Sequence, residues 1–169
     1  MGTLHRELDN TLEAYITAQP MFFIASAPIN SDGLINISPR ATQTLKILDS
    51  NTVAYLDISG GGIESITHIK ENGRLVMMFC GEQGRILRLH GRARAVERYH
   101  AEWPALVSQC GHQEGLRAII VLTVTRISDN ANPLPSVQHS EPPARLVPQR
   151  APRTVVSAEA NRPALRRQQ

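Results

Sequence analysis

The segment RILRLHGRARAVE, residues 85–97, alternates cationic and apolar side chains with a period of two over most of its length. That period is typical of an extended strand, in which successive side chains point to opposite faces. One face is expected to carry Arg88, His90, Arg92 and Arg94, and the other Leu87, Leu89, Gly91, Ala93 and Ala95. The segment therefore predicts a long strand with one cationic face and one small, apolar face.

Five further segments have the composition of strands, and short turns join most of them. They are residues 21–27, 34–38, 52–59, 74–80 and 116–128. The spacing of apolar residues instead predicts helices over residues 3–17, 63–72 and about 99–109. Six strands with helices inserted between them predict a mainly β fold, a closed or nearly closed antiparallel barrel.

The last of these strands, residues 116–128, is apolar on both faces, which predicts that other structure covers both of its sides. The amount of such two-sided apolar strand exceeds what the interior of a small barrel can bury. We therefore expect a homodimer whose interface covers the remainder.

The length of 169 residues allows one domain and a tail, which we place at residues 1–129 and 130–169. The tail contains seven of the 11 prolines and 6 Arg against 2 Glu, so we expect it to be disordered or loosely packed. The first 129 residues carry 12 Lys and Arg against 13 Asp and Glu, so the net charge of +3 comes from the tail. Neither a charged leader nor a long apolar run is seen, which predicts a cytoplasmic protein with no membrane partner.

A glycine turn joins a predicted strand to a predicted helix in DISGGGIESITHIKENGR, residues 57–74. Gly60, Gly62 and Ser65 nearly satisfy the G-x-G-x-x-G pattern of dinucleotide sites, but the third glycine is missing and antiparallel strands surround the turn. No Lys-Ser or Lys-Thr follows the glycines, which excludes a P-loop. Two interpretations stay open: an anion site at the start of the helix, or a turn that only caps it.

The order of these elements, together with three segments, resembles the pyridoxamine 5′-phosphate oxidase-like family, the FMN-binding split barrels. The segments are MFFIASAPINSDGLINISPR, TVAYLDISGGGIESITHIKENGRLVMMFC and RILRLHGRARAVE. The resemblance implies a dimeric six-stranded antiparallel split β-barrel that binds FMN, with the partner subunit completing the pocket. The cofactor-binding residues that it implies are Asn36, Ser38, Arg40, Asp57, Ile58, Ser59, Glu64, Ser65 and Thr67. Of these, Arg40 is the expected phosphate ligand, because it is a fixed cation with several donors.

The chain departs from the pattern of many relatives at three places. Glu64 and Ser65 occupy the positions of an Arg-Lys pair, so the better match is a subgroup with Asn-Glu-Thr or Asn-Glu-Ser, in which Ile63 replaces the Asn. The turn CGEQGRIL is shorter than in that subgroup. The stretch ISDNANPLPSVQHS after the sixth strand lacks the Cys-Gly-aromatic segment that commonly follows it.

The resemblance implies an FMN-dependent oxidoreductase acting on a small molecule, and the sequence identifies no catalytic residue. The alternative is a non-catalytic module that holds flavin, haem or a deazaflavin. The cationic row could contact a phosphate, an acidic substrate or solvent, but no aromatic residue interleaves with it, so no nucleic-acid partner is expected. His90 is the better pocket candidate, whereas His68 is expected to face solvent. Cys80 and Cys110 lack the spacing of a zinc site, so no metal is expected.

Overall fold

The computed structural model describes residues 2–59, 63–81 and 84–131. The three glycines of the turn, Glu82, and the predicted tail from residue 132 onward lie outside the described residues. The interpretations that depend on them therefore stay predictions. Among the described helices, none has the length and apolar character needed to cross a membrane.

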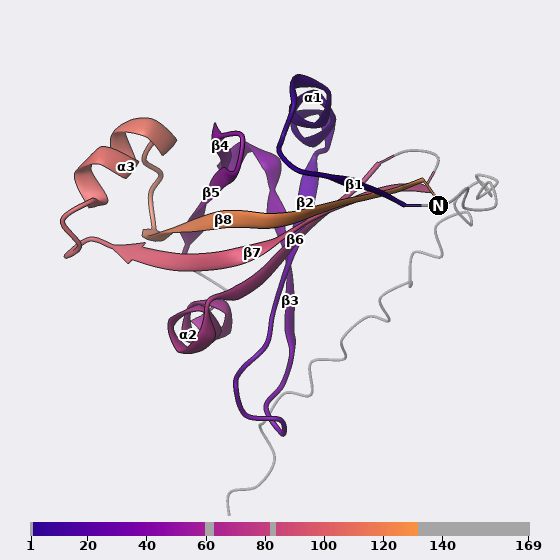
Figure 1. The fold of residues 1–169 in the computed structure, drawn as a ribbon. Coiled ribbons are helices and arrows are strands. Elements are labelled where there is room, and N and C mark those ends of the chain that lie inside the picture. The colour runs from indigo at the N-terminus through magenta and orange to yellow at the C-terminus, as the bar shows by residue number, and fades with distance from the viewer. Residues whose placement is uncertain (1, 60–62, 82–83, 132–169) are drawn as a thin grey trace, which may run out of the picture. The chain divides into compact units, whose positions relative to one another are not determined.

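The described chain forms an eight-stranded antiparallel sheet with helices inserted between its strands (Figure 1). The strands are β1 (Thr3–His5), β2 (Met21–Ser26), β3 (Asn36–Ala41), β4 (Leu45–Asp49), β5 (Thr52–Ile58), β6 (Arg74–Cys80), β7 (Arg85–Glu97) and β8 (Leu116–Ala131). The helices are α1 (Asn10–Ala18), α2 (Ile63–Asn72) and α3 (Trp103–Cys110), with a single 3-10 turn, η1, at Thr42–Thr44.

The order of strands in the sheet is β3-β2-β6-β7-β8-β5-β4, and β1 pairs with β8. Although β3 and β4 are neighbours along the chain, they occupy opposite ends of this path, so the barrel is open between them. The predicted split barrel is thus confirmed. The six predicted strands are all present, with β1 and β4 added to them, and β3 begins at Asn36 rather than at residue 34.

The N-terminal helix is shorter than predicted. Residues 3–5 form β1 on the edge of β8, and the helix begins only at Asn10, where the Asp9 side chain accepts a hydrogen bond from Leu12 N at 2.8 Å. Asp9 satisfies an amide that the first helical turn leaves without a partner, which explains the boundary. The apolar spacing that suggested a longer helix includes Leu4, which is 63% exposed.

Two apolar clusters lie on the two sides of β5 and β8. The larger one contains side chains from α1, α2 and most strands, including Leu12, Ile66 and Ile120. The smaller one packs Ile119 and Val121 of β8 against α3. The expectation that β8 is covered on both sides is confirmed, and α3 provides the cover on the second side.

The cationic and apolar faces of β7 follow the predicted alternation as far as Ala95. Leu87, Leu89 and Ala93 are buried, whereas Arg92 and Arg94 are exposed. Val96 then packs in the smaller apolar cluster, because α3 covers the opposite side of the strand there.

Candidate functional site

The inner face of β3 is polar and lies beside the opening of the barrel. Asn36, Ser38 and Arg40 alternate along the strand and are half-buried, whereas the intervening Ile37 and Pro39 are exposed. Their partners on β2 are Ser26, Ile24 and Phe22, which are all buried. Since directly paired residues share a face of the sheet, the three polar side chains point to the interior side.

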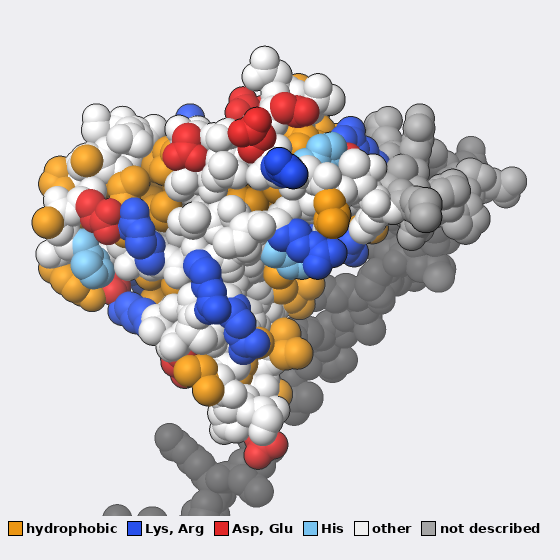
Figure 2. All heavy atoms as spheres, viewed as in Figure 1, with side chains coloured by type: hydrophobic (Ala, Val, Ile, Leu, Met, Phe, Trp, Pro, Cys, Tyr) orange, Lys and Arg blue, Asp and Glu red, His pale blue; other side chains and the backbone are white. Residues whose placement is uncertain are grey.

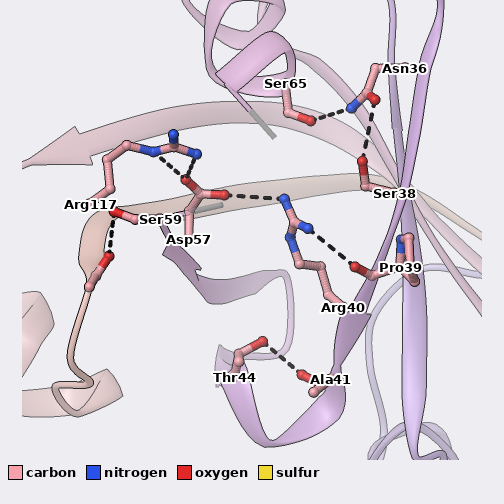
Figure 3. Close-up of polar contacts among 11 residues, drawn as sticks. Asn36, Ser38, Pro39, Arg40, Ala41, Thr44, Asp57, Ser59, Ser65 and Arg117 are labelled. Atoms are coloured by element: carbon pink, nitrogen blue, oxygen red, sulfur yellow. Dashed lines mark hydrogen bonds and ion pairs between the residues drawn. The ribbon is translucent and has the colours of Figure 1, made fainter. Parts of the chain in front are cut away.

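Helix α2 contacts this polar face through its first turn (Figure 3). Asn36 Nδ2 donates a hydrogen bond of 2.6 Å to Oγ of Ser65, which is fully buried. The Ser38 hydroxyl donates to Asn36 Oδ1 at 3.3 Å. Residue spacing alone does not predict the contact between Asn36 and Ser65, because the two residues are 29 positions apart in the sequence.

A buried carboxylate lies next to this group, between two guanidinium groups. Asp57, at the end of β5, has no exposed surface. Arg40 Nη2 donates to Asp57 Oδ1 at 3.3 Å, and Arg117 donates to Oδ2 through Nε at 2.9 Å and Nη2 at 2.5 Å. We call these three residues the Asp57 cluster. It connects β3, β5 and β8 across the opening of the barrel (Figure 3).

Arg117 was not among the predicted site residues. A bulge in β8 positions its side chain at the site. In the pairing of β5 with β8, Asp57 lies opposite Ala118. The next pair is Ile58 with Leu116, so Arg117 has no partner in this ladder. A bulge of this kind redirects the extra side chain, here towards Asp57. The available signal in the sequence was an arginine inside the otherwise apolar run of residues 116–122.

Tyr55 lies directly below the Asp57 cluster on the same face of β5. Its side chain is fully buried, and its ring packs edge-on against Phe22 at 5.8 Å between centroids. Burial, and then the nearby Asp57 carboxylate, raise the pKa of Tyr55 well above its ordinary value, although Arg40 and Arg117 oppose this. The phenol is therefore protonated, and the charge in this region belongs to the Asp57 cluster.

The remaining predicted residues lie around this group with contacts of their own. The Ser59 hydroxyl and amide both donate to the Gly115 carbonyl, at 3.0 and 2.8 Å, and Ile58 is half-buried beside it. Thr67 is exposed, and its hydroxyl donates to Ile63 O within its own helix at 3.2 Å. Glu64 is exposed too, and no described contact joins Glu64 or Thr67 to the Asp57 cluster.

The interpretation that His68 faces solvent is wrong. The residue is only 7% exposed, and its Nδ1 lies 3.0 Å from the hydroxyl of Ser26, which is also buried. The ring lies between α2 and β2 because His68 occupies the same side of the helix as Ser65 and Ile69. His90, in contrast, is half-buried and lines a pocket, as predicted.

An open antiparallel sheet with a polar group at its split places the protein in the class of split barrels. The family model for pyridoxamine 5′-phosphate oxidase matches residues 8–131, and the chain belongs to this family. A relative from Aspergillus flavus, the pyridoxamine 5′-phosphate oxidase family protein ustO, is 32% identical over 133 residues. That match covers 75% of this chain and 53% of the relative, so the chain spans about half of the relative's length.

Solved structures share the fold at low sequence identity. HupZ of Group A Streptococcus matches with a TM-score of 0.59 at 19% identity, over 75% of this chain and 96% of that one. An FMN-binding protein from Syntrophomonas wolfei matches with a TM-score of 0.55 at 13% identity, over 70% and 83%. The split barrel is therefore a fold that this chain shares with a flavin-binding protein.

Proposed function

We propose that this chain binds FMN at the opening of the barrel and acts as a flavin-dependent oxidoreductase on a small molecule. The observation that carries the proposal is the position of two guanidinium groups, Arg40 and Arg117, beside the polar face of β3 at the split. The resemblance to family members and the shared fold with an FMN-binding protein support the same cofactor.

The donor groups at the split suit a phosphate ester. Arg40 and Arg117 share one carboxylate, so the Asp57 cluster has an excess positive charge. A guanidinium has five N–H donors in a planar fork, and a carboxylate occupies only some of them. Asp57 would orient both guanidinium groups, and the hydroxyls of Ser38 and Ser65 would be the candidates to contact the rest of the cofactor.

FMN would supply the redox chemistry, since the flavin ring itself accepts and donates the electrons. The chain's own residues would bind the cofactor and orient it. Arg40 and Arg117 would hold the phosphate, and Asn36 would fix Ser65 at the start of α2 through the bond described above. Glu64 is the one exposed carboxylate in the first turn of that helix, and it disfavours an anion directly at the helix end.

We further propose that the protein is a homodimer whose partner completes the pocket. Aliphatic side chains are exposed along β3 and the loop before it: Ile29, Leu34, Ile35 and Ile37 are 68, 87, 76 and 62% exposed. Such a group of exposed apolar residues is typical of an interaction surface.

An absorption spectrum before and after addition of FMN tests the cofactor. We expect purified protein to bind FMN in a defined ratio and Arg40→Ala to bind it at least about tenfold more weakly, the loss of one charge-assisted contact. Arg94→Ala is the matched control, because Arg94 is an exposed arginine that contacts only Glu102 among the described residues. Equal binding by both variants would remove Arg40 from the site.

The reaction is tested separately, by adding a nicotinamide donor to the FMN-loaded protein under anaerobic conditions. Bleaching of the flavin bands is expected for an oxidoreductase. A yellow protein that is never bleached by donors would instead indicate the non-catalytic binding module, and failure to bind FMN at all would contradict both.

A further inference from the structure

A second pocket lies on the outer face of the sheet, where β2, β6, β7 and β8 run side by side. Its volume is about 410 Å³, within the range of small-molecule sites. Five of its ten lining residues are aliphatic: Ala25, Ala27, Ile35, Leu75 and Val76. The polar residues of the lining are Ser26, Arg74, His90 and Thr125. The pocket therefore combines an apolar floor with a few polar groups, as ligand sites commonly do.

A bulge between β7 and β8 shapes this pocket. His90 lies opposite Arg126 and Gly91 opposite Val124, so Thr125 is the extra residue. At Gly91 the strands approach so closely that a Cβ atom would lie 2.0 Å from the Thr123 carbonyl oxygen, so only glycine fits. The bulge thus places His90, Gly91 and Thr125 together on the pocket wall.

Three cationic or basic side chains form what we call the outer-face cluster: Arg88, His90 and Arg126. His90 lines the pocket, Arg126 lies opposite it on β8, and Arg88 lies two residues before it on β7. The arginines make no hydrogen bond or ion pair with any residue that the structure describes. Burial, followed by Arg126 and Arg88, lowers the pKa of His90. Arg126 lies directly opposite His90, and no acidic group is among those that act on this ring, so the pair lacks a counter-charge.

The nearby arginines Arg74 and Arg92 are different, because the end of α2 supplies their acceptors. Arg74 donates to Asn72 Oδ1 and Pro28 O at 3.2 and 3.0 Å, and Arg92 donates to Asn72 O at 2.6 Å. In Figure 2, blue side chains lie along the middle of the molecular face shown, whereas most red ones lie towards its margins. Arg88 and Arg126, unlike Arg74 and Arg92, therefore have no hydrogen-bond acceptor among the described residues.

We propose that this pocket binds a small aliphatic carboxylate, with the acid group against the outer-face cluster and the chain against Ala25, Ala27 and Val76. A single carboxylate supplies the counter-charge that the cluster lacks. The aliphatic lining suits a hydrocarbon chain and disfavours a polyanion such as a nucleotide, whose several charges would need more donors. The occupant is therefore a monocarboxylate of medium chain length.

The site is separate from the proposed FMN site. On β2, Ala25 faces the outer side and pairs with Ile37, while the next residue, Ser26, is buried on the inner side and pairs with Asn36. Ser26 nevertheless borders the pocket, whereas none of Arg40, Asp57 and Arg117 is among its lining residues. Loss of one ligand need not accompany loss of the other.

The test is a titration of the isotope-labelled full chain with octanoate, followed by two-dimensional NMR of backbone amides. Octan-1-ol and octylamine are titrated in parallel, because they have the same chain with no charge or the opposite charge. We expect octanoate to shift the amides of residues 74–76, 90–91 and 125, and both controls to bind at least about tenfold more weakly, which is the loss of one charge-assisted contact.

Two variants separate the charge from the cavity. Arg126→Gln removes an exposed cation and should weaken octanoate binding about tenfold, whereas Ala25→Leu fills the pocket and should abolish binding. Arg94→Gln is the matched control, since Arg94 is an exposed arginine on β7 that pairs with Glu102 and does not lie opposite His90. Both variants should bind FMN like the original chain, while Arg40→Ala should bind octanoate normally, so failure of either proposed site is distinguishable.

The His90 imidazole gives an independent readout. A bound carboxylate stabilises the protonated ring, so the pKa of His90 should rise on octanoate binding when its Cε1–H signal is followed against pH. The charged groups near the ring are Arg88 on its own strand, Arg126 on β8 and Arg74 on β6.

Three outcomes would overturn the proposal. Equal binding of octanoate and octan-1-ol would show an apolar hollow with no role for the cations. An unchanged pKa of His90 in the saturated protein would place the acid group elsewhere. A dimer in which octanoate shifts none of these amides would show that a second copy of the chain covers the pocket.

Discussion

The Asp57 cluster and the outer-face cluster contain the same kinds of side chain on opposite faces of the sheet, and they differ in their counter-charge. At the split, Arg40 and Arg117 share a carboxylate with no exposed surface. On the outer face, Arg88 and Arg126 lie beside His90, and the structure describes no acidic partner for them. The first cluster contains its own carboxylate and keeps one excess positive charge, whereas the second has no carboxylate among the described residues. The counter-charge therefore predicts a role in stability as well as in binding for the Asp57 cluster, and a role in binding alone for the outer-face cluster.

The largest effect is expected at the compensated group. Asp57→Ala would leave two guanidinium groups without their shared partner in a buried place, which costs about 3 to 5 kcal/mol in unfolding free energy. Chemical denaturation measures it. The matched control is Glu102→Ala, which breaks the ion pair with Arg94, whose side chains are 51 and 48% exposed, and should cost less than about 1 kcal/mol. Similar losses for the two variants would refute the structural role of Asp57.

A second effect concerns the backbone that forms the outer-face cluster. Gly91→Ala would place a Cβ atom against the Thr123 carbonyl, so the strands must separate, and we expect a loss of about 2 to 3 kcal/mol. Thr123→Ala is the control, since that side chain is exposed at the same level of the sheet. Thermal or chemical denaturation of both variants distinguishes them, and an unaffected Gly91→Ala variant would contradict the described bulge.

A third ion pair is more exposed than the Asp57 cluster and less exposed than the pair of Arg94 with Glu102. Arg85 donates to Asp129 at 3.1 and 2.7 Å, and this contact lowers the pKa of Asp129. A lowered folded-state pKa contributes stability that is present above about pH 4, the pKa of an unfolded Asp, and is lost as the pH falls through the lower value.

Asp129→Asn should therefore cost about 1 kcal/mol at neutral pH, and the difference from the original chain should shrink as the pH falls below about 4. Denaturation curves across this range measure it. A difference that stays constant with pH would show that the charge of Asp129 contributes nothing.

The smallest effect is expected from the uncompensated cluster. Arg126→Gln removes an exposed charge that has no partner in the described chain, so stability should change by less than about 0.5 kcal/mol. Arg117→Gln serves as the matched comparison, because it removes a partner of buried Asp57 and should be clearly destabilising. A large loss for Arg126→Gln would show that a counter-charge already exists, and the contrast between the two faces would fail.

Much of the fold could be predicted from local patterns. The alternation in β7 and the two-sided apolar β8 predicted a sheet-based fold, and the helix at residues 63–72 was predicted with the observed bounds. The candidate site could be predicted only in part. Arg40 and Asp57 came from resemblance, while Arg117 was missed because its partner lies 60 residues away and a bulge directs it there.

The sequence by itself determined which segments are strands and which face of each strand is apolar, because these properties depend on residues two to four positions apart. Tertiary structure decided which charges meet. It placed residues 3–5 on β8 instead of in a helix and packed α3 over the second side of β8. It also gave Asp57 two cationic partners, whereas it gave the arginines of the outer-face cluster no described carboxylate partner. These outcomes depend on strand order and on bulges, which bring together residues far apart along the chain. Such contacts produce no periodic pattern of residue types in the sequence.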